Sequence, residues 1–154
     1  MLKFYNFDIV FSEIPDEVTL AINISACPNC CEGCHSPWLW KDEGNLLNQE
    51  SLSALVETYL NEITCVCFMG GDNSPEEVNA LSSFVQSNYA LKTAWYSGKE
   101  NLPETIDARN FNYIKLGPYI KSLGSLKDKT TNQRLYSVSP EGEFQDITSR
   151  FWKK

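Results

Sequence analysis

Four of the six cysteines of this 154-residue chain fall in one short stretch, residues 27–34. Three of them, Cys27, Cys31 and Cys34, have the spacing Cys-x3-Cys-x2-Cys. Thiolates are soft ligands that suit iron–sulfur centres, and three of them can hold three irons of a [4Fe–4S] cluster. The fourth iron would have no protein ligand, whereas an electron-transfer cluster normally has four cysteines. The spacing therefore predicts a cluster with one open iron, where a substrate or cosubstrate can bind.

The same cysteines allow two other interpretations. A structural zinc site would use Cys27-x2-Cys30 and Cys31-x2-Cys34, but zinc sites usually separate their two pairs by about a dozen or more residues. A disulfide is disfavoured because Cys30 and Cys31 are neighbours and the N-terminal residues do not resemble a secretory signal. Cys30 is left over from the three-cysteine motif, and we interpret it as an inert small residue.

Composition narrows the class of protein. The net charge is −7 and no basic run is present, so general nucleic-acid binding is not expected. No apolar run approaches the roughly 20 residues that cross a bilayer, so no membrane association is expected either. We expect a cytoplasmic protein with reduced thiols. The length predicts a single domain over residues 1–154, with one sizeable core.

Alternating strands and helices are expected to position the cysteine stretch. Apolar, β-prone runs predict strands over residues 4–11, 18–25, 64–69, 91–98 and 111–118, and helical spacing predicts helices over 50–63 and 74–87. The strand over residues 18–25 carries no charge and leads directly into the cysteine stretch. Sites in parallel α/β folds lie at the carboxyl ends of strands, so the stretch is at the expected place for chemistry.

This alternation implies βα units and a parallel sheet. A complete (βα)8 barrel needs roughly 200 or more residues, so the fold class predicted here is α/β, an incomplete, open (βα) barrel. Residues 134–138 and 144–147 predict a short C-terminal β-hairpin. Cys65 and Cys67 stand two apart on one predicted strand, and we interpret them as buried small residues on one face, not as ligands.

The chain resembles the activating proteins of anaerobic (class III) ribonucleoside-triphosphate reductases, members of the radical S-adenosylmethionine (SAM) superfamily. The resemblance includes the three-cysteine motif, with Gly33 before its last cysteine, and Gly70-Gly71-Asp72 after a strand. It extends to two further segments, Trp95-Tyr96-Ser97-Gly98 and Thr131-Asn132-Gln133. The chain departs from the family at Asn73, where Pro is common, and at Leu116, where Asp is common.

The resemblance implies an open barrel of the radical SAM type with a [4Fe–4S] cluster on Cys27, Cys31 and Cys34. It implies that SAM binds the open iron through the amino and carboxylate groups of its methionine moiety. Asp72 would pair with the ammonium group, and Gly70 and Gly71 would let the backbone approach it closely. The residues implied to bind the cofactors are Gly33, Cys34, His35, Gly70, Gly71, Asp72 and Ser97. Lys115 would meet a carboxylate if its strand turns it inward, and solvent if not.

The function implied by the resemblance is a radical SAM oxidoreductase that activates a glycyl-radical enzyme. It would cleave SAM reductively to a 5′-deoxyadenosyl radical, which abstracts hydrogen from a backbone glycine. The implied partners are anaerobic ribonucleoside-triphosphate reductase, as protein substrate, and a one-electron donor such as flavodoxin or ferredoxin. The alternatives are an activase of another glycyl-radical enzyme, a radical SAM enzyme with a small substrate, and a non-catalytic iron–sulfur or zinc protein.

Overall fold

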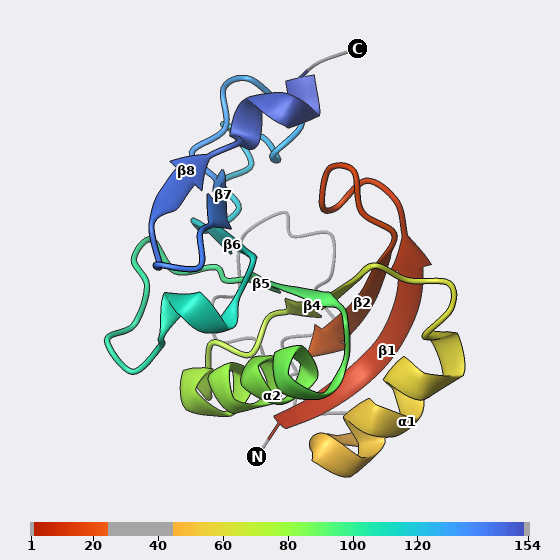
Figure 1. The fold of residues 1–154 in the computed structure, drawn as a ribbon. Helices are drawn as coiled ribbons and strands as arrows, with labels where there is room; N and C mark the ends of the chain where they lie inside the picture. Colours follow the sequence, from red (N-terminus) through yellow and green to blue (C-terminus); the bar gives the residue numbers. More distant parts are fainter. Residues whose placement is uncertain (1, 25–44, 153–154) are drawn as a thin grey trace.

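The computed structural model describes residues 2–24 and 45–152, which form one eight-stranded mixed sheet and two α-helices (Figure 1). Along the sheet the strands follow the order β3-β1-β2-β4-β5-β6-β7-β8. The strands are β1 (Leu2–Val10), β2 (Thr19–Ile24), β3 (Asn45–Leu47), β4 (Cys65–Met69), β5 (Lys92–Tyr96), β6 (Tyr113–Leu116), β7 (Arg134–Val138) and β8 (Phe144–Asp146). The helices are α1 (Gln49–Tyr59) and α2 (Pro75–Asn88), with 3₁₀ helices η2 (Ala108–Asn110) and η3 (Thr148–Trp152).

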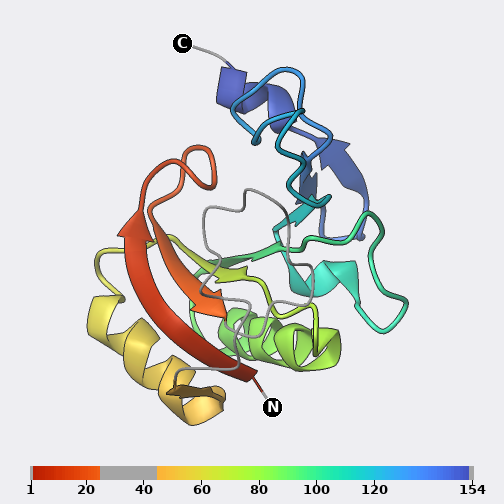
Figure 2. The ribbon, with the colours of Figure 1, turned by 180° about the vertical axis from the view of Figure 1, so that it is seen from behind.

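The predicted incomplete (βα) barrel is wrong. Residues 2–24 and 45–152 form an open sheet and contain more strands than helices. Among the strands of these residues, only the four central ones, β2, β4, β5 and β6, are parallel to one another. The strands β1 and β3 on one side, and β7 and β8 on the other, are antiparallel to their neighbours. Between β1 and β2 the cause is connection length, because a parallel crossover needs about a dozen or more residues. Residues 11–18 are too few for one, so β2 folds back on β1 as an antiparallel ribbon (Figure 2).

Most single elements were predicted correctly. The expected central strands appear as β2, β4, β5 and β6, and the expected C-terminal hairpin appears as the antiparallel pair β7 and β8. Both expected helices are present, and α1 begins at Gln49, one residue before the expected start, and ends at Tyr59, four residues before the expected end. Asn48 caps it, accepting a hydrogen bond from the backbone N of Ser51 at 2.9 Å, while Ser51 Oγ accepts one from the backbone N of Asn48 at 3.0 Å. Ser74 precedes α2 as predicted, but its side chain makes no capping hydrogen bond.

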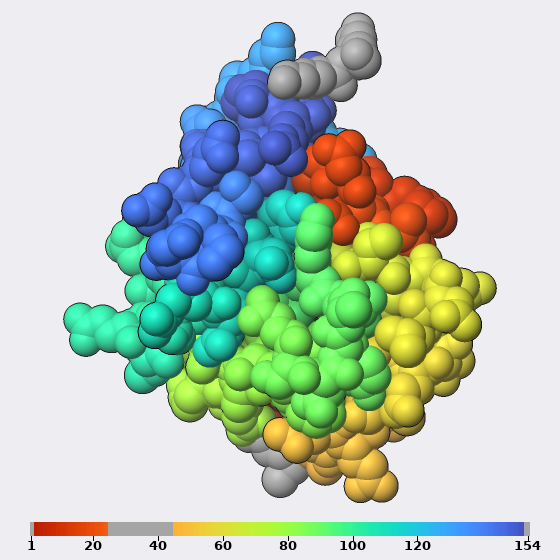
Figure 3. All heavy atoms as spheres, viewed as in Figure 1, coloured from red at the N-terminus to blue at the C-terminus, as the bar shows by residue number. Residues whose placement is uncertain are grey.

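Both faces of the central sheet are buried, which explains why β2 and β4 carry no charged residue. The two helices pack on one face, where Val56 of α1 and Val78 of α2 join Phe68 and Trp95 in one apolar cluster. On the other face, Cys65 and Cys67 pack with residues from outside the parallel strands: Ile14, Leu126, Leu135 and Ile147. Figure 3 shows the C-terminal segment (blue) as one end of the molecule, next to the residues of the central strands. Within the described residues, no helix is long and apolar enough to cross a membrane.

Candidate functional site

The candidate residues in the described part of the chain lie at one edge of the sheet. Gly70, Gly71 and Asp72 directly follow β4, and Ser97 directly follows β5. The strands β2, β4 and β5 are parallel neighbours, so their carboxyl ends meet at this edge. The predicted residues Cys27, Cys31, Cys34, Gly33 and His35, together with Cys30, lie outside the described residues. In the sequence they begin three positions after Ile24, the last residue of β2.

A hydrogen-bonded bridge joins the loop after β4 to the loop after β5. Asp72 Oδ1 accepts a hydrogen bond from Ser97 Oγ at 2.5 Å, and Asp72 Oδ2 accepts one from the backbone N of Gly98 at 2.8 Å. The backbone N of Lys99 donates to Ser97 Oγ at 3.1 Å. These two donors, one on each carboxylate oxygen, hold the orientation of Asp72.

The two glycines before Asp72 are required by the packing of the protein itself. Both have positive φ, +105° at Gly70 and +88° at Gly71, a conformation that favours glycine. A Cβ on Gly71 would lie 2.6 Å from Val78 Cγ2, and a Cβ on Gly70 would lie 3.2 Å from the carbonyl oxygen of Ile24. The tight turn brings the loop against β2 and α2, which places Asp72 at the sheet edge.

Lys115 of β6 brings a positive charge to the same edge. Its side chain turns inward and the residue is 7% exposed, so it is not a solvent-directed lysine. Lys115 Nζ donates to the carbonyl oxygens of Ser97 at 3.1 Å and Gly117 at 2.8 Å, and lies 5.7 Å from the centre of the Tyr96 ring. The signal in the sequence was a lysine in an otherwise apolar strand, but only the fold shows which face it takes.

The Thr131-Asn132-Gln133 segment also packs at this edge. Gln133 Nε2 donates to the carbonyl oxygen of Gly117 at 3.4 Å, and Asn132 Nδ2 donates to that of Pro118 at 3.0 Å. The segment therefore packs against the loop that follows β6, beside Lys115 and far along the chain from Asp72. The resemblance gave this motif no role, and its place next to the candidate site was not predicted.

Cys65 and Cys67 are buried thiols, as predicted. Burial raises the pKa of both thiols well above the ordinary value of 9.0. Cys67 Sγ lies 3.4 Å from Met69 Sδ on the same face of β4. Both side chains are therefore neutral thiols near neutral pH. Among the described residues, no group of three or more His, Cys, Asp or Glu side chains is placed to hold a metal ion.

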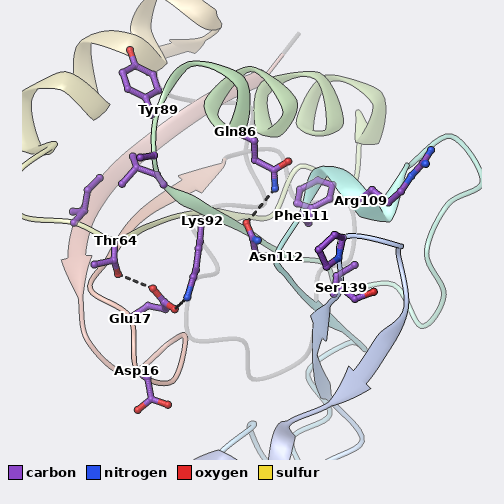
Figure 4. A pocket seen from close by; sticks show the side chains of 15 residues that line it. Asp16, Glu17, Thr64, Gln86, Tyr89, Lys92, Arg109, Phe111, Asn112 and Ser139 are labelled. Atoms are coloured by element: carbon purple, nitrogen blue, oxygen red, sulfur yellow. Dashed lines mark hydrogen bonds and ion pairs between the residues drawn. The ribbon is translucent and has the colours of Figure 1, made fainter.

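A large hollow of about 860 Å³ lies at the opposite edge, beside the amino ends of β4 and β5 (Figure 4). Glu17 lies next to it with its side chain 5% exposed and accepts three hydrogen bonds at 2.8 Å each, from Thr64 Oγ1, Lys92 Nζ and Tyr113 Oη. Burial alone would raise the pKa of Glu17, but these hydrogen bonds lower it below its ordinary value. All three of these hydrogen-bond donors are groups of the protein itself. We therefore interpret the hydrogen-bonded group around Glu17 as structural.

The comparison with protein families identifies a cofactor. A family model described as a 4Fe-4S single cluster domain matches residues 18–107. The match begins just before β2, includes the cysteine stretch, and extends beyond Asp72 and Ser97. No curated protein and no solved structure matches the chain. Because the matched residues are more than half of the chain, it belongs to the 4Fe-4S single cluster domain family and is an iron–sulfur protein.

Proposed function

We propose that this protein is a radical SAM glycyl-radical activase. The observation that carries the proposal is the site at the carboxyl edge of the parallel strands. At this edge, β2, which leads into the three-cysteine motif, lies beside β4, whose following loop holds the oriented carboxylate of Asp72. The chain belongs to the 4Fe-4S single cluster family. Three thiolates, from Cys27, Cys31 and Cys34, fit the donor set of a cluster with one open iron.

The chemistry supplied by the bound cluster is one-electron cleavage of SAM to methionine and a 5′-deoxyadenosyl radical, which takes a hydrogen atom from a glycine Cα. The electron comes from a donor such as flavodoxin or ferredoxin, and the products are 5′-deoxyadenosine and a glycyl radical. The chain itself binds and orients SAM and excludes water from the reacting atoms. Asp72 accepts hydrogen bonds from the ammonium of the methionine moiety, since its two oxygens are already aimed by Ser97 and Gly98.

The substrate we propose is a backbone glycine of anaerobic ribonucleoside-triphosphate reductase. Residues 2–24 and 45–152 form an open sheet and not a closed barrel, which supports a large partner over a small substrate. An enzyme for a small substrate would have to cover the reacting atoms to keep water away from the radical. The net charge of −7 favours a partner that presents basic residues around its glycine loop.

The test is electron paramagnetic resonance after anaerobic incubation of the reconstituted protein with SAM, a one-electron reductant and the candidate reductase. We expect a glycyl-radical doublet that appears with the wild type and with Cys30→Ala, and disappears with Cys27→Ala, Cys31→Ala or Cys34→Ala. The Cys30 variant is the matched control, because it removes a neighbouring thiol that the proposal does not use.

Two results would contradict the proposal in different ways. Bound iron without any SAM cleavage would indicate a non-catalytic iron–sulfur protein. SAM cleavage that modifies a small metabolite, and never produces a radical on the reductase, would indicate a small-substrate enzyme.

A further inference from the structure

We infer that Ser97 is a positioning residue: it orients Asp72 for SAM and does not contact SAM itself. The inference rests on the proposed function and revises the direct contact that the family resemblance implies for Ser97. It concerns the bridge between the loops after β4 and β5.

The hydroxyl of Ser97 is already committed. A serine hydroxyl has a single hydrogen to donate, and Ser97 Oγ donates it to Asp72 Oδ1 at 2.5 Å. The same oxygen accepts a hydrogen bond from the backbone N of Lys99 at 3.1 Å. Ser97 is 0% exposed, so the side chain has no free surface against which a ligand can lie. A hydrogen bond donated by Ser97 to SAM would require breaking the bond to Asp72.

The backbone of Ser97 is fixed from the other side by β6. Its N–H donates to the carbonyl oxygen of Lys115 at 2.9 Å, and its own carbonyl oxygen accepts a hydrogen bond from Lys115 Nζ at 3.1 Å. Lys115 Nζ also donates to the carbonyl oxygen of Gly117. Ser97 is therefore a rigid anchor between β6 and the carboxylate of Asp72.

Asp72 depends on this anchor because its own loop enters the site through two glycines with positive φ, Gly70 and Gly71. Two donors from the next loop, Ser97 Oγ and the backbone N of Gly98, each hold one carboxylate oxygen and so define the plane of the carboxylate. Charge-assisted hydrogen bonds of this kind are short and directional. Without the hydroxyl, the carboxylate loses the contact that Ser97 makes with its Oδ1 atom.

The test is a double-mutant cycle on SAM affinity, measured by titration of the anaerobically reconstituted protein. We expect Asp72→Ala to weaken binding roughly ten- to a hundredfold, and Ser97→Ala to weaken it by a smaller factor, roughly three- to thirtyfold. In the Asp72→Ala background, Ser97→Ala should have no further effect, because it acts only through the carboxylate. Ser97→Thr keeps the hydroxyl and should bind SAM more tightly than Ser97→Ala.

Ser82→Ala is the matched control. Ser82 is also a fully buried serine, and its hydroxyl donates to a backbone carbonyl, that of Asn110, away from the site. Its variant should lose stability in urea but keep the SAM affinity of the wild type. If Ser82→Ala weakens SAM binding as much as Ser97→Ala does, the effect is general destabilisation and the inference is wrong.

The other outcomes separate this inference from the proposed function. If the two single effects multiply in the double variant, Ser97 contacts SAM directly, and the inference fails while the activase proposal stands. If the wild type holds its cluster but does not bind SAM at all, both fail together.

Discussion

At the scale of single residues, five of the six cysteines divide into two groups, and Cys30 belongs to neither. Cys27, Cys31 and Cys34 are the proposed iron ligands, and replacing any one with Ala leaves too few thiolates for three irons. We expect each of these variants to lose the cluster and SAM cleavage, whereas Cys30→Ala keeps both. Iron and sulfide analysis after anaerobic reconstitution measures this. Iron lost from Cys30→Ala but kept in Cys31→Ala would show that the ligand assignment is wrong.

The second group is Cys65 and Cys67, which have neutral, fully buried thiols. Because burial raises the pKa of both well above 9.0, almost no thiolate is present for reaction at pH 8. We expect iodoacetamide to leave both residues unmodified in the native protein and to label them once urea unfolds it. Mass spectrometry of the digested protein locates the label. Labelling of either cysteine in the native protein, at the rate of an exposed thiol, would contradict the burial.

At the scale of elements, the turn between β4 and α2 depends on Gly71. An alanine there would take a positive φ and bring its Cβ within 2.6 Å of Val78 Cγ2, so we expect Gly71→Ala to cost about 1–3 kcal/mol of stability. Urea unfolding measures the loss. Adding Val78→Ala should remove the part that comes from the clash, beyond the cost of Val78→Ala alone.

Gly142, in the connection between β7 and β8, supplies the comparison for Gly71. It also has positive φ, +84°, but its nearest neighbour is the flexible side chain of Arg109, with Cγ 3.2 Å from a built Cβ. Gly142→Ala should therefore show backbone strain with little clash. An equal loss of stability in the two alanine variants would mean that contact with Val78 does not matter.

The elements were more predictable than their arrangement. Apolar runs identify the central strands because each is buried on both faces, and helical spacing identifies α1 and α2. The short strand β3 was missed, since its residues Asn45–Leu47 give no β-prone run. The expected parallel sheet was wrong at β1, which pairs antiparallel with β2 because the connection between them is too short for a parallel crossover. The connection between β5 and β6, residues 97–112, contains the 3₁₀ helix η2.

In the candidate site, too, the residues were more predictable than their arrangement. The family resemblance implied both Asp72 and Ser97, but not the hydrogen bond between them. That bond depends on the register that aligns Met69 of β4 with Tyr96 of β5, and Tyr96 with Lys115 of β6. Register is set by tertiary packing, which a single sequence does not display.

At the scale of the whole molecule, Glu17 ties the amino edge of the sheet together. Its carboxylate joins the loop before β2 to Thr64, Lys92 and Tyr113, which lie at or near the starts of β4, β5 and β6. Because the pKa of Glu17 is lowered on folding, its contribution is fully present above about pH 4.5 and is lost as the pH falls below that value. We expect Glu17→Gln to cost about 1–3 kcal/mol at pH 7, and less in acid, since the amide carries no charge for Lys92 and replaces one acceptor oxygen with an NH2 group.

Urea unfolding of the wild type and the variant, from pH 3 to pH 7, measures this contribution. The neighbouring Asp16→Asn is the control, because the side chain of Asp16 is 86% exposed and only 4.0 Å from Arg150, a pair that contributes little. At alkaline pH the raised pKa of Tyr113, about 12, keeps its hydroxyl donating to Glu17. A difference between Glu17→Gln and wild type that stays constant down to pH 3 would show that the charge of Glu17 plays no part.

The outermost strands of the described sheet, β3 and β8, have three residues each. A strand at the end of a sheet offers unpaired backbone groups to a second chain, and long, flat, apolar ends promote aggregation. Three residues offer few such groups, and β8 also carries the charge of Asp146, which lies 3.7 Å from Arg134. The eight-stranded sheet is therefore protected against growth by strand addition from another copy, at both of the ends that the structure describes.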